Sequence, residues 1–131
     1  MKRLYLSLFV IFIVGRGFAA DDPIYKVANL IMKGNMHELS ALMADNVQIS
    51  MPGTDNTYPK AQAEALLNKF FSQNKPISVK VLHKIVSNAN YGFGVLLMNT
   101  GQRVYRIALT LNEIDGSLRL IELRIETGKT K

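Results

Sequence analysis

His83 is the side chain of this 131-residue chain that is best placed to do chemistry. It interrupts a run in which aliphatic residues recur at every second position from Ile77 to Ile85, so a strand here would put His83 on the apolar face. An imidazole titrates near neutral pH and can act as a general base or contact a ligand. The alternative is a structural histidine at the rim of the core, because single buried polar groups usually find structural partners.

Tyr105 is the second residue of this candidate site. The strand registers predicted below place His83 in one row with Val95 and Tyr105. Neighbouring strands lie about 4.8 Å apart, so the backbones of His83 and Tyr105 would be roughly 10 Å apart, with room for a small ligand group between them. Four more side chains could join them at the mouth of a cavity, or could pack in the core and at its rim: Tyr25, Met51, Tyr58 and Tyr91.

Other catalytic and metal-binding patterns are missing from the sequence. It has two histidines, no cysteine and scattered carboxylates, whereas a metal site needs several converging ligands, so we expect no metal and no cofactor. The segment Gly92-Phe93-Gly94 lies inside a predicted strand, where it indicates a close backbone approach or a bend rather than a phosphate-binding loop. His37, beside Glu38 on the polar face of a predicted helix, is expected to be solvated.

Residues 1–20 are predicted to be a signal peptide. Lys2 and Arg3 precede an apolar run from Leu4 to Val14, and small residues follow for cleavage near Ala19 or Ala20. The alternative is a membrane anchor, but this run is well short of the ~20 residues that a spanning helix needs. We therefore expect a periplasmic or secreted protein without a stable membrane anchor after cleavage.

Cleavage would also remove much of the positive charge. The full chain has 16 basic and 10 acidic residues and a net charge of +6, and loss of the three basic residues of the signal peptide leaves +3. Nucleic-acid binding needs basic residues that cluster on one face, so none is expected. Residues 21–127 are predicted to form one domain, followed by a flexible basic tail at 128–131.

Two short helices and a strand are predicted between Ile24 and Pro52. Asp21 and Asp22, ahead of Pro23, are expected to supply the cap of the first helix, which Gly34 ends, and Asn35 is expected to cap the second together with Glu38. The following residues, 45–46, are expected to turn the chain into a half-buried strand over 47–51. A third helix is predicted from about residue 57 to 73, with a proline in its first turn and Lys75-Pro76 after its end.

Four long strands are predicted to follow. Three-residue loops at 88–90 and 99–101 would join the first three, in a register that puts Phe93, Val95 and Leu97 on one face with Tyr105 and Ile107. Gly92 and Gly94 would then lie on the opposite face. That opposite, outer face would carry a modest apolar patch through which a homodimer could form, or which could be plain surface: Leu96, Val104 and Ala108.

The last hairpin is predicted in detail. Asp115-Gly116 indicates a two-residue turn, which places Leu120 opposite Leu111. The apolar alternation changes phase at Leu120-Ile121, so one extra residue, a β-bulge, is predicted there. With the bulge, Leu123 opposes Leu109, Ile125 opposes Ile107 and Glu126 opposes Arg106.

These elements resemble the nuclear transport factor 2-like superfamily, also called cystatin-like. The segments that carry the resemblance are 33–39, 42–47 and Met51-Pro52, and the chain is most similar to a family of exported bacterial proteins known only as a domain of unknown function. The resemblance implies an α+β fold. Three N-terminal helices would pack on the concave face of a bent, bulged antiparallel sheet of four long strands plus one short strand, forming a cone that could hold a ligand.

Ketosteroid isomerase-like members of the superfamily abstract a proton with an aspartate directly before the proline that ends the first strand. Here that position is Met51, and the position of their helix tyrosine is Val27. Residues 104–111 contain no carboxylate for their second acidic donor. Methionine and valine cannot exchange protons, so the isomerase mechanism is not expected.

Two functional hypotheses remain. The first is a non-catalytic binding or interaction module of the cell envelope, with a small molecule or an envelope protein as its partner. The second is an isomerase- or hydratase-type enzyme that uses His83 as general base and Tyr105 as donor. An open cavity of ~300 Å³ or more that His83 enters would favour a small-molecule ligand or catalysis, whereas a filled cone would favour an interaction role.

Overall fold

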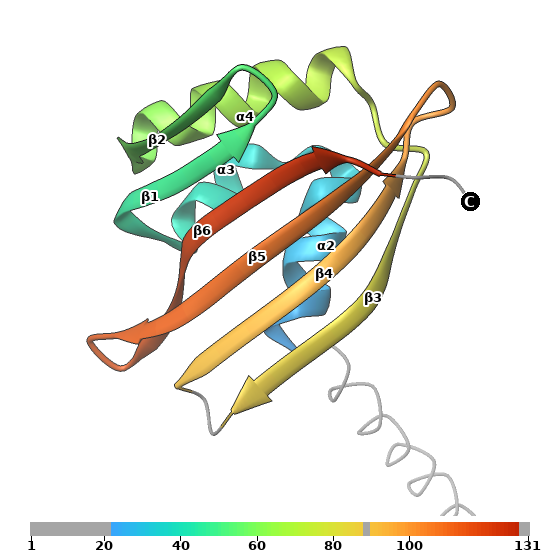
Figure 1. Cartoon of the computed structure of the whole chain (residues 1–131). Coiled ribbons are helices and arrows are strands. Elements are labelled where there is room, and N and C mark those ends of the chain that lie inside the picture. Colours follow the sequence, from blue (N-terminus) through green and yellow to red (C-terminus); the bar gives the residue numbers. More distant parts are fainter. Residues whose placement is uncertain (1–21, 88–89, 129–131) are drawn as a thin grey trace, which may run out of the picture.

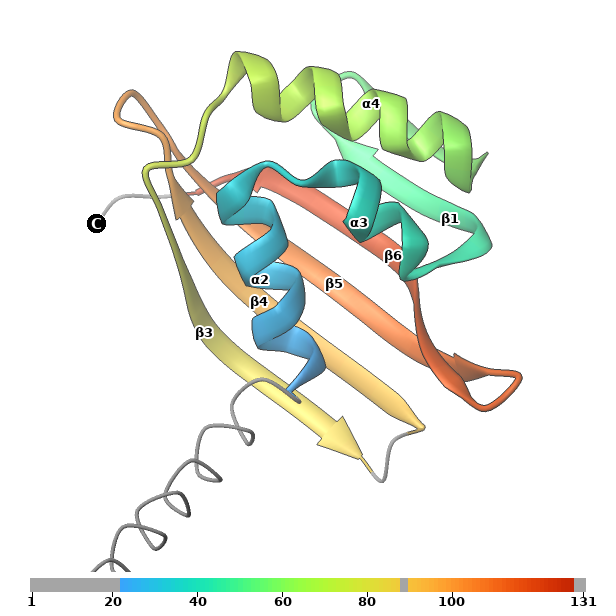
Figure 2. The same ribbon diagram turned by 180° about the vertical axis from the view of Figure 1, so that it is seen from behind.

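A computed structural model describes residues 22–87 and 90–128, so the predicted signal peptide and most of the predicted tail lie outside the described residues. Three helices cover the concave face of one curved, six-stranded sheet (Figures 1 and 2). The helices are α2 Pro23–Lys33, α3 Met36–Ala41 and α4 Lys60–Gln73. The strands are β1 Met43–Met51, β2 Thr54–Pro59, β3 Ser78–Ser87, β4 Tyr91–Asn99, β5 Val104–Ile114 and β6 Ser117–Thr127.

The strand order is β2-β1-β6-β5-β4-β3. Neighbours pair antiparallel except β1 and β6, which are parallel, so the sheet is mixed. The α+β class and the helix-covered, bulged sheet are as predicted, but the sheet has one strand more than expected and is mixed rather than antiparallel. Among the described residues, no helix is both long and apolar enough to cross a membrane.

The corner between α2 and α3 has the predicted caps. Asp22 Oδ1 accepts a hydrogen bond from the Ile24 N–H at 2.9 Å, and Gly34 ends α2 in the left-handed conformation with φ 72°. Asn35 Oδ1 accepts from the Glu38 N–H at 3.2 Å, while its amide nitrogen donates to Glu38 Oε1 at 2.8 Å. These bonds fix the direction of α2, which forms one wall of the candidate site.

The chain between α3 and α4 differs from the prediction. β1 begins at Met43 without a turn at 45–46, and Pro52-Gly53 turns it back into β2, which pairs with β1. α4 therefore begins at Lys60 rather than near residue 57, although it ends at Gln73 as predicted. The sequence does not predict β2, because its residues are polar and mostly exposed and show no apolar alternation. The turn before it does have a sequence signal, since Pro52 is followed by Gly53, a glycine with positive φ.

The β5–β6 hairpin confirms the predicted bulge. Asp115 and Gly116 both have positive φ, as a type I′ turn requires, and Leu111 pairs with Leu120. The register shifts between Thr110 and Leu111, which leaves Ile121 as the extra residue. Beyond the bulge Leu109 pairs with Leu123, as predicted, and so do the next two expected pairs: Ile107 with Ile125 and Arg106 with Glu126.

The predicted register of β4 with β5 is wrong. The connection has four residues, because Thr100 hydrogen-bonds Arg103 through its backbone and hydroxyl, so that Asn99 pairs with Val104. The residues of β4 that share the concave face with Tyr105 and Ile107 are therefore not those predicted. They are Gly92, Gly94, Leu96 and Met98, whereas Phe93, Val95 and Leu97 lie on the convex face.

Gly94 lies under α2 and explains why the concave face of β4 carries glycine. A Cβ atom at this position would lie 2.7 Å from Ile24 Cγ2, closer than real Cβ atoms come to other atoms. Ile24 is itself completely buried. The missing side chain thus lets α2 pack directly on β4, and Ile24 fills the part of the cone above Gly94.

Candidate functional site

His83 lies on the convex face, not on the concave face where it was predicted. It pairs with Val95, but the register of β3 shifts between Val81 and His83. This bulge reverses the alternation, so that Val81 points inward and His83 is exposed on the other side. The sequence prediction assumed an unbroken alternation, and the irregularity at Leu82 is what it missed.

Tyr105 is on the concave face and almost fully buried. Its hydroxyl donates to Asn74 Oδ1 at 3.0 Å, and its ring packs edge-on against Phe70 with centroids 5.3 Å apart. His83 and Tyr105 therefore lie on opposite faces of the sheet. The acid–base pair on which the enzyme hypothesis rests is not formed.

The other predicted site residues are not brought together. Met51 and Tyr58 pack against the core at the β1–β2 hairpin, where the Tyr58 hydroxyl lies 2.7 Å from Thr54 Oγ1. Tyr91 begins β4, three strands away from that hairpin, and is 39% exposed. Val27, at the position of the helix tyrosine of the isomerases, is buried in the hydrophobic core.

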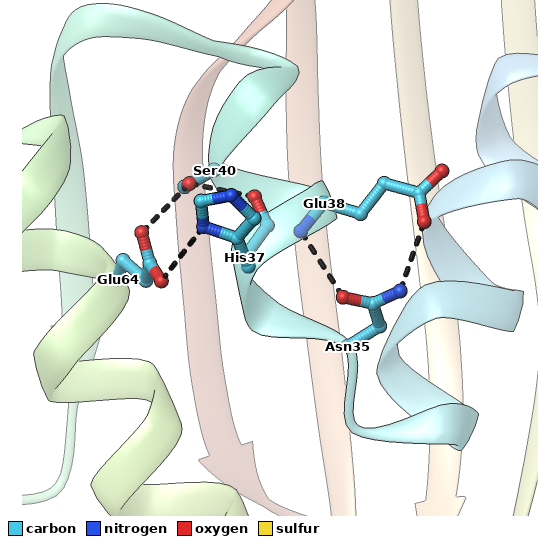
Figure 3. Close-up of polar contacts among 5 residues, drawn as sticks. All are labelled: Asn35, His37, Glu38, Ser40 and Glu64. Atoms are coloured by element: carbon cyan, nitrogen blue, oxygen red, sulfur yellow. Dashed lines mark hydrogen bonds and ion pairs between the residues drawn. The ribbon is translucent and has the colours of Figure 1, made fainter.

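Figure 3 shows a polar cluster of serine, histidine and glutamate between α3 and α4. Ser40 is buried, and its Oγ lies 2.8 Å from the His37 carbonyl oxygen and 2.9 Å from Glu64 Oε1. His37 Nδ1 lies 3.4 Å from Glu64 Oε2, and its side chain is 92% exposed. The histidine contacts the carboxylate rather than the hydroxyl, so it cannot activate Ser40 as a nucleophile. The cluster joins two helices, and no group of three metal-ligating side chains occurs among the described residues.

A groove lies between α2 and β3. It has a volume of about 400 Å³ and meets a second hollow of about 350 Å³ between the C-terminal ends of α2 and α4, because Met32 lines both. The residues that line the α2–β3 groove are Tyr25, Ala28, Asn29, Met32, Val79, Lys80 and Val81. Of the predicted site residues, only Tyr25 belongs to it.

Helical and strand periodicity explain how this groove is built. The four lining residues of α2 follow the spacing i, i+3, i+4, i+7 from Tyr25 to Met32 and therefore share one helix face. Val79 and Val81 come from the concave face of β3. Figure 2 shows α2 lying over this side of the sheet. The sequence signal that was missed is the second apolar pair, Tyr25 and Met32, beside the stripe that packs on the sheet.

Two exposed apolar side chains line the groove, and others lie elsewhere on β3 or directly before it. Of the seven large apolar side chains that are exposed in the described part of the chain, five lie on α2, on β3 or directly before β3. They are Tyr25, Met32, Ile77, Ile85 and Val86. Only Tyr25 and Met32 line the groove, and Ile85, which pairs with Phe93, lies on the convex face. Single exposed apolar residues are normal on protein surfaces, whereas larger exposed apolar patches are typical of interaction sites.

An ion pair lies at the start of α2, beside Tyr25 of the groove. Lys84 Nζ, on β3, pairs with Asp22 Oδ2 at the start of α2 and lies 5.1 Å from the centre of the Tyr25 ring. Burial tends to raise the pKa of Asp22, but hydrogen bonds from Lys84 and from the backbone N–H groups of Ile24 and Tyr25 outweigh it and lower the pKa below 3.8. The hydrogen bond to Asp22 raises the pKa of Lys84 above 10.5.

This pair predicts a pH dependence of stability. A carboxyl group whose pKa is lowered by folding stabilises the fold above its unfolded pKa, and this contribution is lost as the pH falls through the lowered value. We expect Lys84→Met to lower the free energy of unfolding at pH 7 and the difference from wild type to shrink below about pH 3.8. Urea unfolding at pH 7, 4 and 2.5 measures this difference. Lys69→Met, at an exposed site on α4, is the control, and a pH-independent difference for Lys84→Met would contradict the assignment.

Sequence and structure comparisons place the chain in a family. The model of the family called domain of unknown function DUF4783 matches residues 24–126. The chain belongs to this family. A DUF4783 family protein from Bacteroides ovatus has 23% identity and a TM-score of 0.73, with 79% of this chain and 94% of that chain covered. One from Bacteroides uniformis has 21% identity and a TM-score of 0.76, covering 83% and 100%. A search among curated proteins found no match.

More distant structures confirm the superfamily fold expected of this DUF4783 protein. An NTF-2 like protein of unknown function from Burkholderia xenovorans has 10% identity and a TM-score of 0.62, with 82% of this chain and 81% of that chain covered. An uncharacterized protein with a cystatin-like fold from Silicibacter pomeroyi has 14% identity and a TM-score of 0.61, covering 81% and 73%. At such identities the likeness concerns the fold alone.

Proposed function

We propose that this DUF4783 protein is an exported, non-catalytic binding module that holds a partner protein of the cell envelope in the α2–β3 groove. The observation that carries the proposal is the apolar lining of this groove, with exposed Tyr25 and Met32 on the α2 wall and partly buried Val79 and Val81 on the β3 wall. Export is supported by the charged start, the apolar run and the small residues of positions 1–20. Catalysis is disfavoured because His83 and Tyr105 are on opposite faces and Met51 and Val27 cannot transfer protons.

An apolar fluorescent dye of the anilinonaphthalene type tests the groove. Met32 and Ile114 are both 39% exposed, but only Met32 lines the groove. We expect Met32→Asp to remove at least half of the dye fluorescence of the processed protein and Ile114→Asp to leave it nearly unchanged. Equal losses in the two variants would show that the dye reports general surface hydrophobicity and would contradict a binding groove.

A homodimer through the outer sheet face remains a second proposal, with different residues. Leu96, one of the three predicted, is fully buried on the concave side, while Val104 and Ala108 are partly buried on the convex side. The convex face also carries Phe93, Val95 and Leu97, which enlarge the apolar row. Sedimentation of the processed protein as a monomer at micromolar concentration would contradict this dimer.

A further inference from the structure

β3 forms one edge of the sheet (Figure 1). Three of its residues, Val79, Lys80 and Val81, line the α2–β3 groove. An edge strand has unpaired backbone N–H and C=O groups, which can accept another strand. We propose that an extended, acidic segment of a partner protein adds to β3 along Ser78–Val81 and places its alternate apolar side chains in the groove. This inference rests on the proposed function and specifies its partner.

The bulge defines where a strand can be added. The register of β3 is regular from Ser78 to Val81 and shifts before His83, so the ladder is straight only in the first segment. Val79 and Val81, which line the groove, belong to this segment. An added strand alternates its side chains, so every second one would point toward α2, where Tyr25 and Met32 leave apolar surface exposed.

The size of the groove fits a short segment. The helix face from Tyr25 to Met32 covers seven residue steps, or about 10 Å at 1.5 Å per step. An extended chain advances about 3.3 Å per residue, so three residues cover this length and five to seven also reach the hollow between α2 and α4. Two or three apolar side chains would therefore enter the groove.

The charge around the groove selects an acidic segment. Lys80 lines the groove, and Lys33 and Lys75 line the adjoining hollow, whereas neither is lined by a carboxylate. None of these three lysines forms an ion pair with a residue that the structure describes. Opposite charges across neighbouring strands are favourable, and like charges are unfavourable. A second copy of this chain is a poor occupant for the same reason, because pairing the Ser78–Val81 segments of two β3 strands would bring the two Lys80 side chains together.

Two blocked, fluorescein-labelled heptapeptides test the inference by anisotropy with the processed protein at low salt. One alternates valine with glutamate, and the other alternates valine with lysine. We expect the glutamate peptide to bind at least tenfold more tightly. Lys80→Glu should weaken its binding about tenfold and strengthen that of the lysine peptide, while Lys60→Glu, at the far end of α4, should change neither.

Backbone methylation tests strand addition itself. Methylating one peptide nitrogen at a time should abolish binding at every second position and be tolerated between them, since only alternate N–H groups of an added strand face β3. The inference would be overturned if Lys80→Glu left the affinity of the glutamate peptide unchanged, or if the methylation effects did not alternate along the peptide. Failure of both peptides to bind, or a protein dimer that buries β3, would overturn it as well. The dye experiment, which needs no peptide, distinguishes these failures from failure of the proposed function.

Discussion

Gly94→Ala should lower the free energy of unfolding by about 2 kcal/mol, although glycine to alanine in a strand usually stabilises a protein. The added methyl group would overlap Ile24 Cγ2, which lies 2.7 Å from its position. Ile24 is fully buried between α2 and the sheet, so it has no space into which to move. Urea unfolding at pH 7 measures the change.

Gly92→Ala is the matched control for this prediction. It is buried on the same face of β4, but its added methyl group would meet the flexible end of Leu111 at 3.2 Å, so the cost should stay below 1 kcal/mol. The double variant Ile24→Ala with Gly94→Ala should be at least 1 kcal/mol more stable than the sum of the single effects, because each change relieves the other. Equal costs at the two glycines would show that α2 does not pack on β4 as described.

Export should shorten the protein. We expect cells that express the full chain to release a product whose intact mass corresponds to cleavage after Ala19 or Ala20. Such cleavage leaves Asp22, and with it the cap of α2 and the ion pair to Lys84, in the processed protein. The cap and the ion pair at the start of α2 would thus lie only a few residues from the new N-terminus.

The apolar run gives the control for export. Phe9→Arg puts a charge in the middle of Leu4–Val14, which opposes insertion of this segment into the membrane by about 3 kcal/mol. The variant should accumulate as a full-length precursor inside the cell. A wild-type chain that keeps residues 1–20 and stays in the cytoplasm would contradict the export proposal.

Local rules predicted the β5–β6 hairpin well. Asp115-Gly116 indicates a two-residue turn, and the apolar pattern beyond it places the bulge at Leu120 or Ile121, where the structure has it. The local sequence also predicted the helix corner at Gly34 and Asn35, because its capping hydrogen bonds join residues that are close together in sequence. In both cases the decisive contacts are local.

β4 and β3 were harder to predict because their registers depend on small local irregularities. One more residue in the loop before Val104 reversed the faces of β4, and one bulge after Val81 moved His83 to the convex side. The prediction that His83 and Tyr105 share one face was wrong for the same reason. The choice between Gly94 and Phe93 as the inward residue depends on how closely α2 approaches, which is a tertiary contact that no local pattern reports.

The α2–β3 groove could be inferred only in part. The spacing of Tyr25 and Met32 on one helix face was visible in the sequence, but their exposure depends on β3 being the last strand of the sheet. Strand order arises from long-range pairing, including the parallel contact of β1 with β6. Residue types alone therefore predicted a site inside the cone, whereas the groove in the structure lies at the edge of the sheet, between α2 and β3.

Site-specific photocrosslinking in the native cells tests most directly whether this protein binds its partner through the groove. A benzophenone side chain replaces Asn29, which lines the groove, or Asn112, which is equally polar and exposed but lies on β5. We predict a covalent adduct with an envelope protein from position 29, reduced when Met32→Asp is added, and none from position 112. Adducts from position 112 alone, or equal adducts from both positions, would contradict the account.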